Sequence, residues 1–313
     1  MRPRPLGHTG LHVSPVGFGA WQLGNSTDWK AMPDDVALEL VATALDLGVT
    51  LFDTAPHYAN TNSERLLGEG LAGRRADVVL VSKFGHTLDG GKDFSVAAFE
   101  RELEGSLRRL RTDFLDVLLL HNPGFDLLAG DDPIWSALDA AKRDGRLRHY
   151  GVSLDTAAEV EACVGQTGST VLEVLFNVFH QDVRRAFSRV RAAGTGLIAK
   201  VPLDSGWLTG RFDGRSSFTG VRARWTPEQI AQRAALLERI AWLTDTGDPL
   251  AHRALGYLLS YEEVGCVIPG TRTLEQLRDN VAAANCEVMG AERQRLEALW
   301  DEVTHEGRQP LPW

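Results

Sequence analysis

Short runs of β-branched and leucine residues alternate with longer segments of helical periodicity along almost the whole chain, and this alternation limits the possible folds more than any other feature. Strands are predicted at residues 16–20, 49–54, 78–83, 114–121, 147–153, 171–177, 196–202 and 264–269. Helices are predicted at residues 34–47, 63–72, 96–111, 133–144, 156–164, 182–193, 249–261, 273–284 and 292–303. Strict alternation implies parallel strands, because each crossover returns the chain to the same end of the sheet.

Eight strand–helix units in 313 residues favour an α/β protein with a closed (β/α)8 barrel, the TIM barrel, formed as a single domain over residues 1–313. An open sheet would leave edge strands, and the runs carry few of the charges that protect an edge. Residues 6–13 predict an N-terminal β-hairpin. A long insert separates strands 7 and 8, with a glycine- and arginine-rich stretch at 206–225 and an extra helix at 227–243. Such loops lie at the carboxyl-terminal face of a barrel, where its chemistry occurs.

The formal net charge of −9 and the lack of a lysine- or arginine-rich block argue against a nucleic-acid partner. No apolar run approaches the roughly 20 residues of a membrane helix, and the first residues lack the apolar stretch of a signal peptide. Cys163, Cys266 and Cys286 form no closely spaced pair, so neither a disulfide nor a structural metal site is expected. These features predict a cytoplasmic protein, a monomer or small homo-oligomer, with no bound metal.

Polar side chains stand at the carboxyl ends of the predicted strands, which share one mouth in a barrel. They are Asp53, Lys83, His121, Ser153, Asn177 and Lys200, and Tyr58 follows Asp53 by five residues. Any one alone is more commonly a solvated rim residue. A lysine beside a tyrosine, however, favours the phenolate and lowers the phenol pKa, a carboxylate orients that lysine, and a histidine hydrogen-bonds a carbonyl oxygen. The combination predicts a tyrosine that protonates an alkoxide formed by hydride transfer.

The sequence resembles the aldo-keto reductase superfamily from residue 6 to residue 287, in the strings LFDTAPHYAN, SERLLGEGL, VLVSKFG, DFLDVLLLHNP, YGVS, GWLTGRF and IPGTRTLEQLRDN. These strings occur in the order and at the spacing that the family shows. Carried over position by position, the family's catalytic tetrad falls on Asp53, Tyr58, Lys83 and His121. The resemblance implies an NAD(P)H-dependent enzyme that reduces an aldehyde or ketone with Tyr58 as the general acid. DTAPHY and HNP look most like bacterial members that act on sugars and small aldehydes, which implies a sugar-like carbonyl or alcohol substrate.

The resemblance also implies NADP(H), or less often NAD(H), bound in an extended pose across the barrel mouth, without the GxGxxG turn of a Rossmann fold. The residues expected to bind it are Gly19, Ser153, Glu173, Lys200, Pro202, Leu203, Gly206, Leu208, Gly270, Thr271, Arg272, Gln276 and Asn280. Arg272, at the start of a helix, could pair with a 2′-phosphate, or it is a surface charge. Insert arginines that could close over the pyrophosphate, or only solvate the loop, are Arg211, Arg215, Arg222 and Arg224.

Three positions around the expected nicotinamide site depart from the family's commonest pattern. Leu154 replaces the asparagine that usually follows Ser153, Glu173 replaces a glutamine, and Lys200 replaces the aromatic residue that stacks on the ring. Because strands 6 and 7 are neighbours, we expect Glu173 and Lys200 to form an ion pair beside the ring. The alternative is that Lys200 points elsewhere and another side chain covers the ring.

Aromatic residues in predicted loops could wall the substrate pocket, since rigid rings stack on sugars. They are Trp21, Trp29, Phe84, Trp207 and Trp225. The side chains expected to contact the substrate are Trp21, His57, Phe84, His86, Asn122 and Trp207. Two other functions stay open. One is a lyase on the same barrel that forms a Schiff base on Lys83 or Lys200, and the other is a non-catalytic subunit that binds the cofactor.

Overall fold

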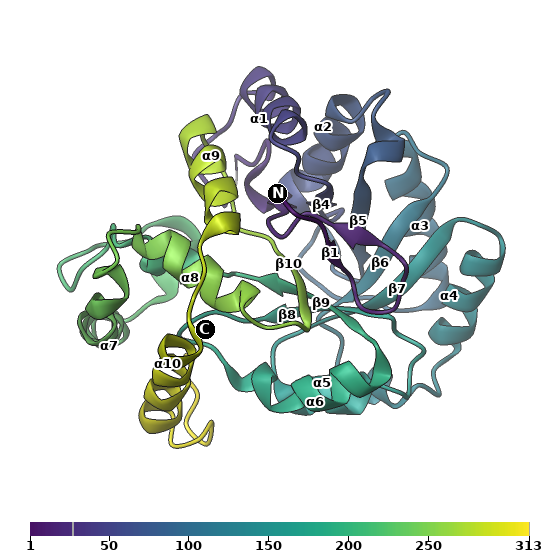
Figure 1. Cartoon of the computed structure of the whole chain (residues 1–313). Coiled ribbons are helices and arrows are strands. Elements are labelled where there is room, and N and C mark those ends of the chain that lie inside the picture. Colours follow the sequence, from purple (N-terminus) through teal and green to yellow (C-terminus); the bar gives the residue numbers. More distant parts are fainter. Residues whose placement is uncertain (27, 313) are drawn as a thin grey trace.

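The computed structural model describes residues 1–26 and 28–312, which form an eight-stranded parallel barrel surrounded by helices (Figure 1). The strands are β3 (Phe18–Gly19), β4 (Leu51–Asp53), β5 (Val79–Phe84), β6 (Leu115–His121), β7 (Leu147–Leu154), β8 (Val171–Leu175), β9 (Gly196–Lys200) and β10 (Val264–Val267). Each pairs with the next in chain order. Parallel bridges from Val16 to Val267 and from Gly19 to Gly270 join the first strand to the last. The predicted (β/α)8 fold is confirmed.

The helices follow the strands in the predicted order, and some of them have a side-chain cap at their start. They are α1 (Asp34–Asp46), α2 (Asn62–Gly70), α3 (Val96–Arg109), α4 (Pro133–Arg143), α5 (Ala157–Cys163), α6 (Phe187–Ala193), α7 (Pro227–Arg239), α8 (Leu250–Leu259), α9 (Leu274–Ala282) and α10 (Gly290–Val303). The Asp132 side chain accepts a hydrogen bond from the N–H of Ile134 at the start of α4, where Pro133 occupies the first turn. Thr226 and Gln229 form a capping box at α7. The helix predicted at 182–193 is a 3-10 turn, Asp182–Ala186, followed by α6.

The N-terminal hairpin, β1 (Arg4–Pro5) paired with β2 (His12–Val13), lies across one end of the barrel (Figure 1). Leu6 is fully buried against the start of β9. Gly7 has φ +56°, and a Cβ there would lie 2.4 Å from the carbonyl oxygen of Gly194. Glycine is therefore required for this close approach. The hairpin closes the amino-terminal end, so access to the barrel interior is from the carboxyl-terminal end.

Two hydrophobic layers follow from the alternation of side chains along the strands. One set fills the barrel and includes Leu51, Val81, Leu119, Val171 and Ile198. The strand residues between these inward-facing positions point outward, and they pack against the inner faces of the helices to form the larger outer core. In residues 1–26 and 28–312, no helix combines the length and hydropathy needed to cross a membrane.

The insert between β9 and β10 is confirmed and contains α7, α8 and three 3-10 turns. The turns are Asp204–Thr209, Gly220–Arg224 and Ala241–Thr244. The extra helix predicted at 227–243 ends at Arg239.

Candidate active site

Polar side chains cap the apolar filling of the barrel, each two residues beyond an inward-facing hydrophobic position. Asp53 follows Leu51, Lys83 follows Val81, and His121 follows Leu119. The same step leads from Val171 to Glu173 and from Ile198 to Lys200. Because side chains in a strand alternate with period two, these groups point into the same carboxyl-terminal opening as the hydrophobic residues below them. The strand pattern thus gathers side chains that are distant in the sequence.

Lys83 is the centre of this group and is completely buried. Its Nζ donates hydrogen bonds to both carboxylate oxygens of Asp53 at 2.6 Å and to the carbonyl oxygen of Thr54 at 3.2 Å. An oxygen of Glu173 lies 3.1 Å from the same nitrogen. Burial opposes the charge, but Asp53 and Glu173 outweigh it and raise the pKa of Lys83. Lys83 is therefore a fixed cation between two carboxylates.

Asp53 and Glu173 share the Lys83 cation, and this sharing affects the pKa of Asp53. Burial, and next the proximity of Glu173, raise the pKa of Asp53 well above its usual range, and Lys83 only partly opposes this effect. The outer oxygen of Glu173 accepts a hydrogen bond from Ser153 Oγ at 3.3 Å. Two buried carboxylates therefore compete for one lysine cation at the base of the site.

Tyr58 lies above this group, in a 3-10 turn that follows β4. Three successive non-glycine residues after it, Ala59, Asn60 and Thr61, have positive φ, so the chain turns sharply where it presents the phenol. The ammonium of Lys83 lies 5.2 Å from the centre of the phenol ring, and the His121 ring lies 6.0 Å from it. The four tetrad positions are therefore together in space.

Lys83 acts on the pKa of Tyr58 in the expected direction, downward, but the net shift is upward. Burial of the phenol raises this pKa, and the opposing effect of Lys83 is smaller and is partly cancelled by Asp53 and Glu173. His121 is affected in the opposite sense, because burial and then the charge of Lys83 move its pKa well below the usual range. At neutral pH the site contains a neutral phenol and a neutral imidazole above a lysine cation.

A cavity of about 580 Å³ extends from this site to the start of α9. The predicted residues that line it are Gly19, Trp21, Trp29, Asp53, His57, Tyr58, His121, Asn122, Glu173, Lys200, Pro202, Leu203, Gly206, Gly270, Arg272, Gln276 and Asn280. His86, which was expected to contact the substrate, is not part of the lining. Asn280 is held by a hydrogen bond to Thr271 Oγ1 at 3.2 Å, which places Thr271 behind the wall. Ser153 is also behind the wall, under Lys200. One end of the cavity meets the tetrad, and the other meets a helix start with an arginine.

Several predicted contacts are corrected by the packing. Phe84 ends β5 with its ring against Phe94 and Phe99, so it belongs to the outer core and does not wall the pocket. Trp207 is fully buried, and it packs with Trp225 in an aromatic group inside the insert. The side chain of Leu208 is in the core as well. The predicted pocket roles of Phe84, Trp207 and the Trp225 ring, and side-chain contact of Leu208 with a cofactor, are therefore wrong.

The expected ion pair between Glu173 and Lys200 is not formed. Lys200 lies opposite Leu175 in the β8–β9 register, whereas Glu173 lies opposite Ile198, so the lysine is two residues closer to the mouth. Its Nζ lies 2.8 Å from Asp155 and donates to Ser153 Oγ at 2.7 Å. Glu173 faces Lys83 instead.

The insert and the loop after β3 meet over the cavity. The guanidinium of Arg222 lies 4.9 Å from the centre of the Trp29 ring, and its Nε donates to the carbonyl of Ser205 at 2.8 Å. Arg272 donates to the carbonyl of Lys30, joining the start of α9 to the same loop. Arg211 and Arg222 line the cavity, but the Arg215 side chain is 94% exposed and pairs only within its own turn, with Asp213. A role for Arg215 over a pyrophosphate is not supported.

Some lining residues were missed by the sequence reasoning. Asp155 stands two residues beyond Ser153 and could have been found by extending the period of two past the end of the strand. Ser205 and Phe212 lie in the irregular part of the insert, where no periodicity marks an inward face. Gln22 lies in a short 3-10 turn after β3 and carried no such signal either.

A barrel whose carboxyl-terminal mouth joins a tyrosine, a buried lysine and a histidine to an elongated cleft defines an oxidoreductase of the NAD(P)H-dependent barrel class. The chain belongs to the aldo/keto reductase family, whose model matches residues 15–301.

Similar proteins agree with this assignment. L-galactose dehydrogenase of Arabidopsis thaliana is 30% identical over 96% of this chain and 94% of its own length. NADH-specific methylglyoxal reductase of Escherichia coli is 26% identical over 96% of this chain and 99% of its own length. The holo form of the aldo-keto reductase AKR11C1 from Bacillus halodurans has a TM-score of 0.81 and 26% identity, with 96% of each chain covered.

Proposed function

We propose that this protein reduces a sugar-like aldehyde or ketone, with NADPH as the hydride donor and Tyr58 as the proton donor. The observation that carries the proposal is the position of Tyr58 between the Lys83 cation and the cavity. When bound, the nicotinamide supplies a hydride to the carbonyl carbon. The carbonyl oxygen then becomes an alkoxide and takes the phenol proton, which leaves a phenolate beside Lys83.

The charges at the site suit this direction of proton transfer. The phenol is protonated near neutral pH, but its raised pKa makes it a weaker acid, so proton transfer depends on stabilisation of the phenolate that forms. The Lys83 ammonium stabilises the phenolate once it forms, and Asp53 holds that ammonium in place. Neutral His121 lines the cavity and can donate a hydrogen bond to the carbonyl oxygen, which would orient it toward Tyr58.

The residues at the far end of the cavity fit the phosphorylated dinucleotide. Nη1 of Arg272 is buried and has no hydrogen-bond partner among the residues that the structure describes, so it can accept an anion such as a 2′-phosphate. The start of α9 also lies at this end, where Gln276 and Asn280 line the cavity. For the substrate, Trp21 and His57 provide flat surfaces next to Tyr58, which suits a sugar-like carbonyl. A curated relative named for L-galactose supports that choice.

The lysine geometry argues against a Schiff-base lyase. A nucleophilic amine must be unprotonated, and Lys83 is held as an ammonium by two carboxylates. Lys200 is likewise paired with Asp155 at 2.8 Å.

Tyr58→Phe tests the proposal, because it removes the transferable proton and keeps the ring. With NADPH and a panel of sugars and small aldehydes, we expect the turnover rate to fall by about 10²- to 10⁴-fold. The dissociation constant of NADPH, measured by fluorescence titration, should change less than about threefold. Turnover that survives in Tyr58→Phe would refute the assignment of the acid. A wild-type protein that binds NADPH but reduces no member of the panel would favour the non-catalytic alternative.

A further inference from the structure

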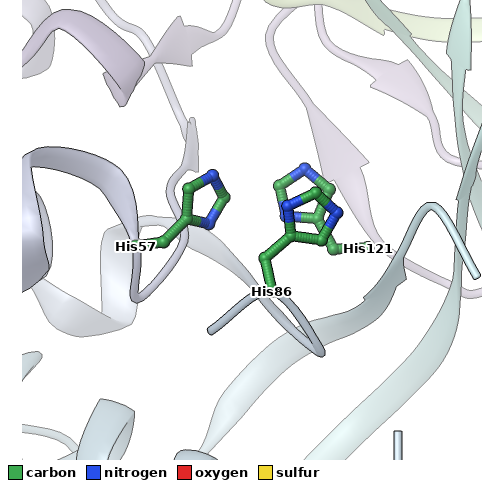
Figure 2. Close-up of side chains that lie close together, drawn as sticks. All are labelled: His57, His86 and His121. Atoms are coloured by element: carbon green, nitrogen blue, oxygen red, sulfur yellow. The ribbon is translucent and has the colours of Figure 1, made fainter. Parts of the chain in front are cut away.

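Three histidines from separate segments of the chain meet at the active-site mouth. His57 precedes the Tyr58 turn, His86 follows β5, and His121 ends β6. Figure 2 shows the ring of His57 facing the pair formed by His86 and His121. The centres of the His86 and His121 rings are 4.5 Å apart, and the His57 ring lies 5.1 Å and 4.9 Å from them. One ring nitrogen from each residue lies within 4.8 Å of the other two.

The free nitrogens of this group have no other function in the fold. Nε2 of His86 and Nδ1 of His121 are both buried, and neither has a hydrogen-bond partner among the residues that the structure describes. A buried ring nitrogen without a partner is costly, so such atoms call for a ligand. An imidazole nitrogen binds a metal ion through the lone pair that it has in the neutral form.

We propose that His57, His86 and His121 form a binding site for a divalent transition-metal ion such as Zn²⁺ at the mouth of the active site. Three neutral imidazoles are a typical donor set for zinc, with water in the fourth position. Zn–N bonds of about 2.0–2.1 Å place tetrahedral ligands about 3.4 Å apart, so nitrogens that lie within 4.8 Å of one another must approach by up to about 1.4 Å. His57 and His86 are only partly buried and can rotate to make this adjustment.

The surrounding charges act in both directions. Lys83 is paired with Asp53 and Glu173, and Lys200 is paired with Asp155, whereas Lys92 adds a positive field at His86 that opposes a cation. The affinity must therefore come from the three imidazole donors. Within residues 1–26 and 28–312, no second group of three histidine, cysteine or carboxylate side chains has this spacing. The site is therefore specific to the mouth.

Occupancy has a functional consequence, which rests on the function proposed above. His121 cannot coordinate the ion and also orient a substrate carbonyl toward Tyr58 in the same geometry, so the ion should compete with the carbonyl substrate. Zn²⁺ is then a reversible inhibitor, and a chelator restores activity.

Binding is tested without activity, by calorimetric titration of Zn²⁺ into the chelator-treated full chain. We expect one equivalent to bind, with affinity at least tenfold weaker in His57→Asn and in His86→Asn. His12→Asn is the matched control, because His12 is exposed on the hairpin at the opposite end of the barrel, and it should bind as the wild type does. Co²⁺ should give the visible absorption of a tetrahedral site in the wild type, independently of any variant.

The outcomes separate this proposal from the proposed function. Equal Zn²⁺ affinity in all variants, or no tetrahedral Co²⁺ spectrum, would overturn the metal site whether or not the enzyme reduces carbonyls. Saturable binding with the expected variant pattern supports the site even if no substrate is turned over. Where turnover is measurable, the competitive part of the proposal is overturned if saturating Zn²⁺ leaves KM for the carbonyl unchanged.

Discussion

Glu173→Gln should make the protein more stable near pH 8, although it removes one partner of a buried lysine. The Glu173 side chain is only 3% exposed, and its carboxylate oxygen lies 3.1 Å from Lys83 Nζ. At an effective dielectric constant of about 20, that attraction amounts to about 5 kcal/mol. Asp53 contacts the same nitrogen at 2.6 Å, so the two acidic oxygens are at most about 5.7 Å apart and repel each other by at least about 3 kcal/mol.

Burying the Glu173 charge adds a desolvation cost of several kcal/mol, so repulsion and desolvation together exceed the attraction. Glutamine keeps the shape and an oxygen that accepts from Ser153, without the charge. We therefore expect the free energy of unfolding to increase by about 1–3 kcal/mol, which is roughly 2–6 °C in Tm.

The gain should depend on pH in a direction set by Asp53. Its folded-state pKa is raised, by burial first and by Glu173 second, so the folded state binds a proton more tightly than the unfolded chain does. Stability then declines as pH rises from the unfolded value of about 3.9 through the folded value. Removing the charge of Glu173 brings the folded-state pKa of Asp53 closer to its unfolded value. The stability gained by Glu173→Gln is therefore largest above the folded-state pKa, and it disappears at a pH where Asp53 is protonated in both the folded and the unfolded state.

Urea unfolding of wild type and Glu173→Gln between pH 4 and pH 8 measures the effect. Glu161→Gln on α5 is the matched control, because it makes the same chemical change on an exposed side chain and should shift stability by less than about 0.5 kcal/mol. A Glu173→Gln protein that is less stable than wild type at pH 8 would show that the ion pair with Lys83 outweighs repulsion and desolvation.

Two further predictions concern the cofactor. Arg272→Ala should weaken the affinity for NADPH about 10- to 100-fold and that for NADH less than about threefold, because a charge-assisted contact with a 2′-phosphate is lost. Fluorescence titrations with both cofactors measure the two affinities, with Arg215→Ala as the exposed control. Equal losses of affinity for NADPH and NADH would contradict this prediction. Lys200→Met should change the ratio of affinities for oxidised and reduced cofactor by less than about threefold, because Asp155 at 2.8 Å cancels much of the lysine's field; a larger change would show that Lys200 acts on the ring as an unpaired cation.

The fold and the meeting of Asp53, Lys83 and His121 at one mouth could be predicted because both depend on short-range periodicity, whereas the catalytic role of these residues and of Tyr58 was implied by the family resemblance. The period of two in the strands places Lys83 above Val81 and Asp53 above Leu51, and strand alternation with helices fixes the parallel order. The same parity excludes Phe84, which follows inward-facing Lys83 and so must face the helices. The alternation along this strand could therefore have placed Phe84 in the outer core from the sequence alone.

Other features depend on three-dimensional relationships that no local pattern contains. The partner of Lys200 is set by the stagger between β8 and β9, which raises it one layer above Glu173. Trp207 is buried because the irregular insert folds into an aromatic cluster of its own. The pKa of Tyr58 depends on how far burial outweighs Lys83, which is a balance of magnitudes rather than of residue types.

The charge balance beneath Tyr58 connects stability with catalysis. Asp53 and Glu173 both raise the pKa of the phenol, whereas Lys83 lowers it. We therefore expect a glutamate at position 173 to lower the folding stability and, by raising the Tyr58 pKa, to keep the phenol protonated over a wider pH range. Glu173→Gln should move both quantities together, since it lowers the Tyr58 pKa as it relieves the buried repulsion, and the alkaline decline of carbonyl reduction would then begin at lower pH. If stability rises while that decline stays in place, Glu173 acts on Lys83 and Asp53 without reaching the phenol.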